Sequence, residues 1–218
     1  MKTNISIIEK TLARSNELYA IIMHDVYSID HYRLIRSVLT KNLSGISLEH
    51  SNSIMHLMAV NNYTTAVSLL RLQYEAITRA MWTHFAAKES FLAKYAAPSD
   101  IKKLPPDFPT ITVMIEQISN GPVKGPGEML RSFKEVTWSG MNSFVHNGFL
   151  PIERFLNGYP EGLLIQIVES SNALNIMVAM VLARMSGELA LVSLVKQLQL
   201  DYKDCLPTLQ PIDPVSTK

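Results

Sequence analysis

The sequence is poor in cysteine, in charge and in the residues that interrupt helices. Its single cysteine, Cys205, excludes a disulfide framework and a zinc site built from thiolates. Asp, Glu, Lys and Arg make up 18% of the chain, against a typical value of about 25%. Twenty basic and nineteen acidic residues give a formal net charge of +1. This balance excludes a global field that holds nucleic acid or an anionic membrane, but it is compatible with a local patch.

Only nine Gly and eleven Pro occur in 218 residues, and their clustering leaves long stretches with helical rather than alternating periodicity. No run of residues stands out as a strand. A chain of this length buries a core without help from a metal or from disulfides. Residues 1–9 lack the apolar segment of a signal peptide, so we expect a cytoplasmic protein. The sequence therefore predicts an all-α fold.

The clusters of Gly and Pro divide the chain into expected helices. We expect a bundle of five to seven helices in a single domain over residues 1–205, with two long helices at its centre, and a disordered tail over residues 206–218. Gly45 and Pro98 are expected to end helices, Gly148 to end another in a left-handed conformation, and Pro151 and Pro160 to frame a turn. The expected helices cover residues 5–26, 31–43, 47–58, 63–97, 111–118, 128–147 and 161–200.

The run over residues 173–183 is apolar on nearly all sides, which raises the question of a membrane span. Eleven residues are too few to cross a bilayer core of about 30 Å, and polar residues follow at 184, 186 and 188. We therefore expect no membrane span here, but a core helix or an oligomer interface. Residues 189–198 add more apolar surface. Because exposed apolar stripes tend to be partner surfaces, we expect a homodimer that packs through the last helix.

The first candidate site lies within residues 63–97, where Arg71, Glu75 and Arg79 follow one another at spacings of four. This spacing places them on one face of a helix, and Trp82 falls close to the same face. One interpretation is an exposed ladder of ion pairs, each contributing roughly a few tenths of a kcal/mol. The other is a partly buried pair of guanidinium groups that binds a carboxylate or a phosphate, because the neighbouring residues are apolar.

The second candidate is a polar stripe at the end of the expected helix over residues 128–147. One interpretation is an amphipathic helix with a polar face toward water. The other centres on His146, because the last turn of a helix favours a protonated imidazole and the following loop can admit a substrate. No Ser-His-Asp spacing supplies a catalytic partner for this histidine. The stripe consists of Glu135, Ser139, Asn142, Ser143 and His146.

No metal or cofactor site is expected. The spacings of His24, Asp25, Asp30 and His31, and of the histidines at 50 and 56, match no usual zinc or iron pattern. The Gly-rich stretch over residues 121–127 lacks both the Lys-Ser/Thr ending of a phosphate-binding loop and a preceding strand.

Three segments carry a resemblance: residues 69–82 (LLRLQYEAITRAMW), residues 138–148 (WSGMNSFVHNG), and the Gly158-Tyr159 pair after them. In order and spacing they resemble an uncharacterised family of bacterial helical proteins over roughly residues 60–190. More distantly, the chain is similar to HEPN-like helical bundles, many of which are ribonuclease toxins or parts of toxin–antitoxin and anti-phage systems. The resemblance implies a helical bundle, a dimer, and RNA or an antitoxin protein as a partner.

The resemblance also selects residues. It implies that Arg71, Glu75, Arg79, Trp82, Asn142 and His146 are the recurring polar positions. A catalytic HEPN protein normally has an Arg four to six residues before its His. Residues 139–141 contain none ahead of His146. Arg79 and His84 have this spacing, but five residues correspond to about 140° of helical rotation, so their side chains should diverge. If His146 is the active histidine, Arg71 or Arg79 must reach it across the bundle.

Two functions are therefore expected as alternatives. The first is a metal-independent ribonuclease, an effector of a toxin–antitoxin or anti-phage system. In it His146 acts as general acid and base on a 2′-OH, Arg71 or Arg79 stabilises the charge on phosphorus, and Asn142 orients the histidine. The second is a non-catalytic interaction or sensor module, in which the same polar residues fix the helix register and eleven Met form an adaptable surface.

Overall fold

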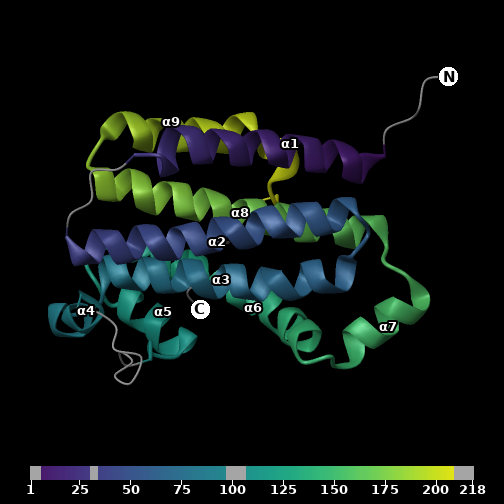
Figure 1. The fold of residues 1–218 in the computed structure, drawn as a ribbon, viewed down its shortest axis with the longest axis horizontal. Helices are drawn as coiled ribbons and strands as arrows, with labels where there is room; N and C mark the ends of the chain where they lie inside the picture. Colours follow the sequence, from purple (N-terminus) through teal and green to yellow (C-terminus); the bar gives the residue numbers. More distant parts are fainter. Residues whose placement is uncertain (1–5, 30–33, 97–106, 209–218) are drawn as a thin grey trace, which may run out of the picture.

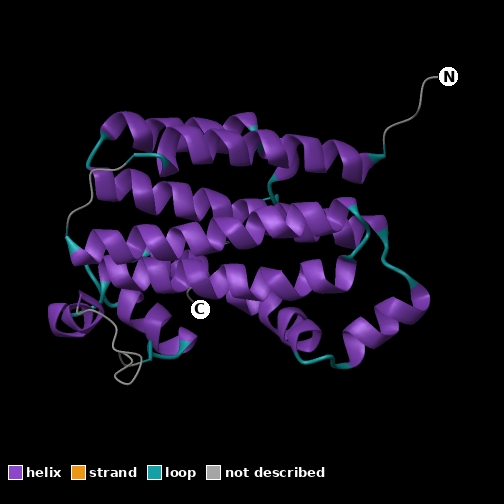
Figure 2. Cartoon of the chain, in the orientation of Figure 1, coloured by secondary structure: helices purple, strands orange, loops and turns teal. Residues whose placement is uncertain are grey.

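The computed structural model describes residues 6–29, 34–96 and 107–208, and these residues form helices joined by loops, with no strand among them (Figures 1 and 2). This confirms the predicted all-α class. The described residues contain nine α-helices, so the predicted number of five to seven is wrong. They are α1 (Ile7–Ile21), α2 (Ile35–Ala59), α3 (Tyr63–Phe85), α4 (Glu89–Ala96), α5 (Ile111–Ser119), α6 (Gly125–Val145), α7 (Phe149–Asn157), α8 (Glu161–Ser186) and α9 (Leu189–Asp201), with a π-helix, η1 (Ile22–Tyr27), and a 3-10 helix, η2 (Lys203–Cys205).

Three long helices, α2, α3 and α8, pack against one another at the centre of the bundle. The helices α1 and α9 cover α8 on one side, while α5 and α6 cover α3 on the other (Figure 1). The short helix α4 packs against α2, and α7 packs against α6 and extends from the lower edge in this view. The sequence predicted two central helices, and the third, α2, was divided into two shorter ones by that prediction.

The helix α2 runs without interruption through Gly45, which corrects the expectation that this glycine ends a helix. The hydroxyl group of Tyr27 lies where a β-carbon on residue 45 would stand. Glycine at this position therefore allows a close approach of η1 to α2 rather than a turn. The expected start of this helix at residue 31, with Asp30 as its cap, lies outside the described residues.

The expected helix over residues 63–97 is two helices, because the chain turns at residues 86–88 between α3 and α4. Arg36 of α2 stabilises this turn: its Nη1 donates to the carbonyl oxygen of Thr83 at 2.5 Å, and its Nη2 donates to that of Ala87 at 2.7 Å. The same guanidinium pairs with Glu89 at 2.6 Å. Carbonyl groups freed by the end of α3 thus find their donor on another helix, which no local sequence signal reveals.

The predictions for the second half of the chain need three corrections. Gly187 adopts a left-handed conformation (φ 75°) and divides the expected helix over residues 161–200 into α8 and α9. The left-handed residue after α6 is Asn147 (φ 51°), not Gly148. The expected turn between Pro151 and Pro160 is the helix α7, because Pro151 lies in its first turn, where a missing N–H is tolerated, and Pro160 directly precedes α8.

A hydrogen-bonded network of polar side chains lies buried between the three central helices. Gln73 of α3 donates through Nε2 to the carbonyl oxygen of Ser171 and to Oδ1 of Asn175, at 3.0 and 3.1 Å. Asn175 donates in turn to Ser51 of α2 at 2.7 Å. All four residues are fully or almost fully buried. Because slipping one helix against another breaks these bonds, the network fixes the register of α2, α3 and α8.

The helix α8 is long and apolar enough to cross a membrane, with a mean hydropathy of 1.4 over an 18-residue window. Of that window, 67% is buried inside the bundle. The packing of α8 against α1, α2, α3 and α9 accounts for its apolar character. At the end of the described chain Leu206 packs against the core, and residues 209–218 of the expected tail lie outside the described residues.

Candidate functional site

The helices α3 and α6 bring the two candidate groups of the sequence together. Four-residue spacing aligns Arg71, Glu75 and Arg79 along one face of α3, and the same spacing aligns Trp138 and Asn142 on α6 with His146, the residue that ends it. Because α3 and α6 pack against each other, these two rows meet. We call the resulting group the α3–α6 cluster: Arg71, Glu75, Arg79, Trp138, Asn142 and His146.

Arg71 is the centre of the α3–α6 cluster. Its Nε donates to Oε1 of Glu75 at 2.9 Å, and its Nη1 donates to Oδ1 of Asn142. The same Nη1 lies 3.4 Å from Nε2 of His146. The guanidinium carbon lies 4.6 Å from the centre of the Trp138 ring, which is the distance of a cation–π contact. One side chain of α3 thus contacts three side chains of the other helix.

The ion pairs of the cluster are partly buried. The side chains of Arg71, Glu75 and Arg79 are 18%, 16% and 33% exposed. Glu75 is shared, because its Oε2 accepts from Nη2 of Arg79 at 3.1 Å while its Oε1 accepts from Arg71. Lys134, whose ammonium lies 5.3 Å from the Trp138 ring centre, adds a third positive charge on the α6 side of the cluster. The excess of positive charge suits an anionic ligand.

Arg79 has the freer guanidinium group of the two arginines. Besides its bond to Glu75, it lies 6.0 Å from the centre of the Phe108 ring, at the limit of a cation–π contact. Arg71, in contrast, is held by Glu75, Asn142 and Trp138 together. Arg79 therefore has N–H donors left to bind an anion, whereas Arg71 offers a positive charge that is fixed in position.

His146 lies exposed at the C-terminal end of α6, where its backbone N–H donates to the carbonyl oxygen of Asn142. Arginine can only donate, so in its contact with Arg71 the Nε2 atom of the imidazole must accept, and a neutral ring then carries its proton on Nδ1. The separation of 3.4 Å makes this a weak contact. A substrate can therefore replace Arg71 at Nε2 at little cost.

The structure changes two assignments within the site. The indole beside Arg71 belongs to Trp138 and not to Trp82, which is buried and donates through Nε1 to Gln117 at 2.6 Å. The side-chain oxygen of Asn142 accepts from Arg71, so in this structure Asn142 orients the arginine and not the histidine. The sequence did contain a signal for Trp138, since it precedes Asn142 and His146 at the same four-residue spacing.

The other residues of the predicted stripe and the Arg79–His84 pair lie apart from the cluster's contacts. Ser143 accepts the backbone N–H of Leu150 at 3.1 Å and thereby supports the start of α7, while Glu135 and Ser139 are exposed on α6. Arg79 and His84 form no hydrogen bond with each other. The Nδ1 atom of His84 is buried without a hydrogen-bond partner, and burial, aided by the charge of Arg36, lowers the pKa of this imidazole.

Across residues 6–29, 34–96 and 107–208, no group of three or more His, Cys, Asp or Glu side chains is arranged to hold a metal ion. The cluster offers instead two guanidinium groups, an imidazole with an accessible nitrogen, and a carboxylate that holds the arginines. These groups can bind a phosphate and move a proton.

Comparison with known proteins gives one match. No curated protein and no solved structure matches the chain. The model of a family of unknown function (DUF6988) matches residues 44–208, which include every residue of the α3–α6 cluster and exclude α1 and the first part of α2. On this match over most of its length, the chain belongs to the DUF6988 family.

Proposed function

We propose that the α3–α6 cluster is the active site of a metal-independent ribonuclease, in a cytoplasmic, HEPN-like bacterial protein of a toxin–antitoxin or anti-phage system. One observation carries this proposal: Nη1 of Arg71 on α3 lies 3.4 Å from Nε2 of His146 at the end of α6. Residues 139–141 include no arginine that could serve His146. In this proposal the arginine and the histidine come from two different helices instead.

The proposed reaction is the attack of a 2′-OH on the adjacent phosphorus. His146 accepts the 2′-OH proton at Nε2 as the new oxygen–phosphorus bond forms, and the same imidazolium then donates this proton to the departing 5′-oxygen. The products are a 2′,3′-cyclic phosphate and a 5′-OH. Arg79 and Arg71 stabilise the negative charge that grows on the phosphoryl oxygens. Asn142 and Glu75 are positioning residues, because each holds Arg71 and neither contacts the reacting atoms.

The test is cleavage of a fluorescently labelled single-stranded RNA by the purified protein in the presence of EDTA. We expect the wild type to cleave and His146→Ala to lose at least about a hundredfold in rate, because general acid–base catalysis contributes about 10²–10⁴. Arg79→Ala should also lose activity. The matched control is His24→Ala, since the side chain of His24 is 89% exposed on η1 and, among the described residues, pairs with its neighbour Asp25 alone.

Three outcomes contradict the proposal: no cleavage by the wild type, cleavage by His146→Ala at the wild-type rate, or products that carry no cyclic phosphate. Circular dichroism of each variant separates loss of the active site from loss of the fold.

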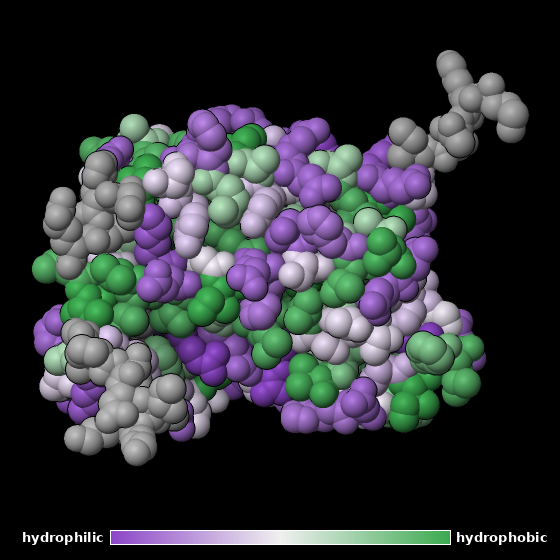
Figure 3. Space-filling model, viewed as in Figure 1, coloured by the Kyte–Doolittle hydropathy of each residue, from purple (hydrophilic) through white to green (hydrophobic). Residues whose placement is uncertain are grey.

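A second candidate function is an interaction module, and the outer face of α7 favours it. Phe149, Ile152, Phe155 and Leu156 are exposed on this short helix, and Phe155 is 83% exposed. Large apolar side chains gathered on one element mark a contact surface. The space-filling view shows hydrophobic surface at the lower right, where α7 lies in the same orientation (Figures 1 and 3). The partner proposed here is a second copy of the chain, which makes the protein a homodimer; an antitoxin protein is the alternative occupant.

A further inference from the structure

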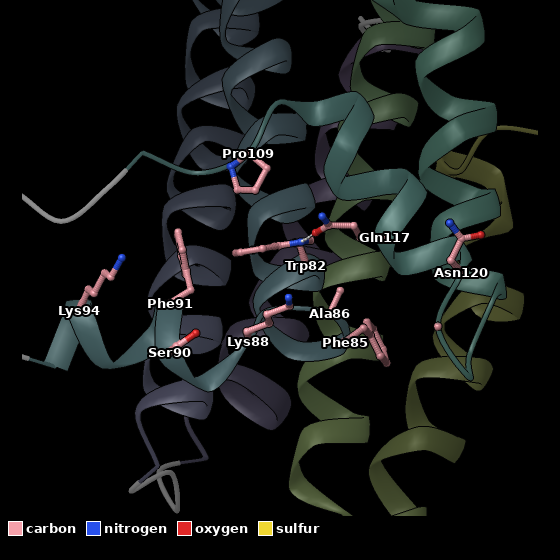
Figure 4. A pocket seen from close by; sticks show the side chains of 11 residues that line it. Trp82, Phe85, Ala86, Lys88, Ser90, Phe91, Lys94, Pro109, Gln117 and Asn120 are labelled. Carbon is pink, nitrogen blue, oxygen red and sulfur yellow. Dashed lines mark hydrogen bonds between the residues drawn. The ribbon is translucent and has the colours of Figure 1, made fainter.

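A pocket of about 620 Å³ opens at the end of the bundle, where α3 ends and α4 and α5 pack beside it (Figure 4). Its volume falls within the range of about 300–1,000 Å³ that is usual for small-molecule sites. Aromatic and charged side chains alternate along the wall: in Figure 4 Lys88 lies between Phe91 and Phe85, and Lys94 lies beyond Phe91. The residues used below are Trp82, Phe85, Lys88, Phe91, Lys94 and Gln117.

The aromatic part of the wall is held by contacts between helices. Nε1 of Trp82 donates to Oε1 of Gln117 on α5 at 2.6 Å, a bond drawn as a dashed line in Figure 4. The ring of Phe91 on α4 meets the Trp82 indole edge to face, with ring centres 4.9 Å apart. Arg36 fixes the turn between α3 and α4. The pocket is therefore formed before any ligand arrives.

The charged part of the wall is positive. Lys88 and Lys94 form no ion pair with any residue of the described chain, and no carboxylate lines the pocket. The nearest acidic residue in sequence, Glu89, is held by Arg36 at 2.6 Å. Within the described residues the amide nitrogen of Gln117 makes no hydrogen bond, while the amide oxygen accepts from Trp82. The pocket thus combines aromatic surface, free cations and an amide donor.

The pocket adjoins the α3–α6 cluster along α3. Phe108 links the two, since Arg79 lies 6.0 Å from the Phe108 ring centre, and that ring lies 5.8 Å from the Trp82 ring centre. Trp82 follows Arg79 by three residues on the same helix. A polymer with one phosphate bound at Arg79, such as an RNA strand, can therefore place a neighbouring nucleotide in this pocket.

We propose that the pocket binds a nucleotide. Its base packs against Phe91 and the edge of Trp82, with Gln117 as hydrogen-bond donor to the base edge, and its phosphate is bound by Lys88, while Lys94 adds positive charge at the outer end of the pocket beyond Phe91 (Figure 4). The combination selects this class, because an inorganic anion uses only the lysines and a neutral aromatic molecule uses only the rings. The nucleotide is either a free mononucleotide or one unit of an RNA strand. Binding of an RNA strand rests on the proposed ribonuclease function, whereas binding of a free mononucleotide does not depend on it.

The test is isothermal titration calorimetry of the full-length protein. The probes are AMP, GMP, CMP and UMP, a 2′-O-methyl oligoribonucleotide of ten residues that resists cleavage, and inorganic phosphate. The variant is Lys88→Glu with Lys94→Glu, which reverses two exposed charges without changing the buried wall. The matched control is Lys10→Glu with Lys196→Glu, exposed lysines of α1 and α9 that lie elsewhere and change the net charge equally.

We expect the Lys88/Lys94 variant to weaken nucleotide binding at least tenfold and the Lys10/Lys196 variant to change it less than twofold. Binding of a mononucleotide identifies a free nucleotide as the ligand; binding of the oligonucleotide alone identifies a unit of a strand. The proposal is overturned if no nucleotide binds, if the two double variants behave alike, or if inorganic phosphate binds as tightly as the nucleotides.

The cleavage assay keeps the two proposals distinct. If the wild type binds a nucleotide, the Lys88/Lys94 variant does not, and the wild type cleaves no RNA, the nucleotide pocket is supported and the ribonuclease is not. RNA cleavage by the wild type, without nucleotide binding in calorimetry, supports the ribonuclease and removes the nucleotide pocket.

Discussion

Arg71 has a different role in the structure from the one its sequence spacing indicates. The four-residue spacing to Glu75 is that of an ion-pair ladder on a helix surface, and this bond does form, at 2.9 Å. The guanidinium also contacts Asn142, His146 and Trp138, all from a segment more than sixty residues later in the sequence. The partly buried alternative of the two sequence interpretations therefore describes this residue better.

His84 is the residue whose environment predicts a pH dependence of stability. Burial, with a smaller contribution from Arg36, lowers its pKa in the folded protein below the ordinary value of 6.5. The unfolded chain then binds the proton more strongly than the folded one. The stabilisation is complete above pH 6.5 and is lost as the pH falls from 6.5 through the lower, folded pKa.

The variant His84→Gln should therefore show a shallower loss of unfolding free energy than the wild type between pH 7.5 and pH 5. Urea denaturation at a series of pH values measures this slope. The slope is the readout, because the substitution can change stability at all pH values through packing. His50, whose pKa burial also lowers, should contribute a further part of the slope that His50→Gln removes. Equal slopes in wild type and His84→Gln contradict the prediction.

At the scale of elements, a glycine alone does not tell where a helix ends. Gly187 ends α8 with a positive φ, whereas Gly45 lies inside α2, where the absence of a β-carbon leaves room for Tyr27. The two residues look alike in sequence, since each follows an apolar, helical stretch. The difference depends on what another element places next to them.

The sign of φ predicts different effects on stability for two glycine-to-alanine substitutions in or next to α8. A β-carbon at residue 187 meets nothing within 4 Å, but φ is 75°, so Gly187→Ala should destabilise the protein by about 1 kcal/mol through the backbone alone. A β-carbon at residue 162 is equally unobstructed, and Gly162 lies in the first turn of α8 with no positive φ. Gly162→Ala should be neutral or stabilising by up to about 1 kcal/mol.

Urea denaturation of the two alanine variants beside the wild type measures both values. If both substitutions shift the midpoint in the same direction by the same amount, the conformational argument for Gly187 is wrong.

At the scale of the whole molecule, the apolar residues of α9 are largely used inside the chain itself. Leu191, Val195 and Leu198 are buried against the rest of the bundle. The sequence expectation of a dimer through the last helix depended on such residues being available to a partner. The exposed face of α7 is a more suitable surface, because α7 packs mainly against α6 and keeps its large side chains outside.

We therefore predict that self-association depends on α7. The variant Phe155→Asp with Leu156→Asp should be monomeric under conditions in which the wild type is a dimer, because an isologous interface loses two apolar contacts from each copy. Sedimentation equilibrium measures the mass. The matched control is Leu189→Asp, an exposed leucine at the start of α9. A dimer that survives the α7 substitutions and dissociates with Leu189→Asp assigns the interface to the last helix instead.

The sequence by itself determined the helical class and the rows of side chains along single helices. Arg71, Glu75 and Arg79 share a face, as do Asn142 and His146, because helical periodicity is a local property that spacing reports directly. Polar residues at the end of α6 were identified for the same reason. The buried bonds of Gln73 and Asn175 were missed, because their spacing does not differ from that of exposed polar residues.

Only the tertiary structure decided how these rows meet. Packing of α3 against α6 selected Trp138 and not Trp82 as the indole beside Arg71, and gave Asn142 to the arginine and not to His146. Arg36 donates to carbonyl groups at the end of α3, and Tyr27 packs closely against α2 at Gly45. Each of these contacts joins residues on different elements. Their distance and direction depend on how helices pack, which the spacing of residues along one helix does not contain.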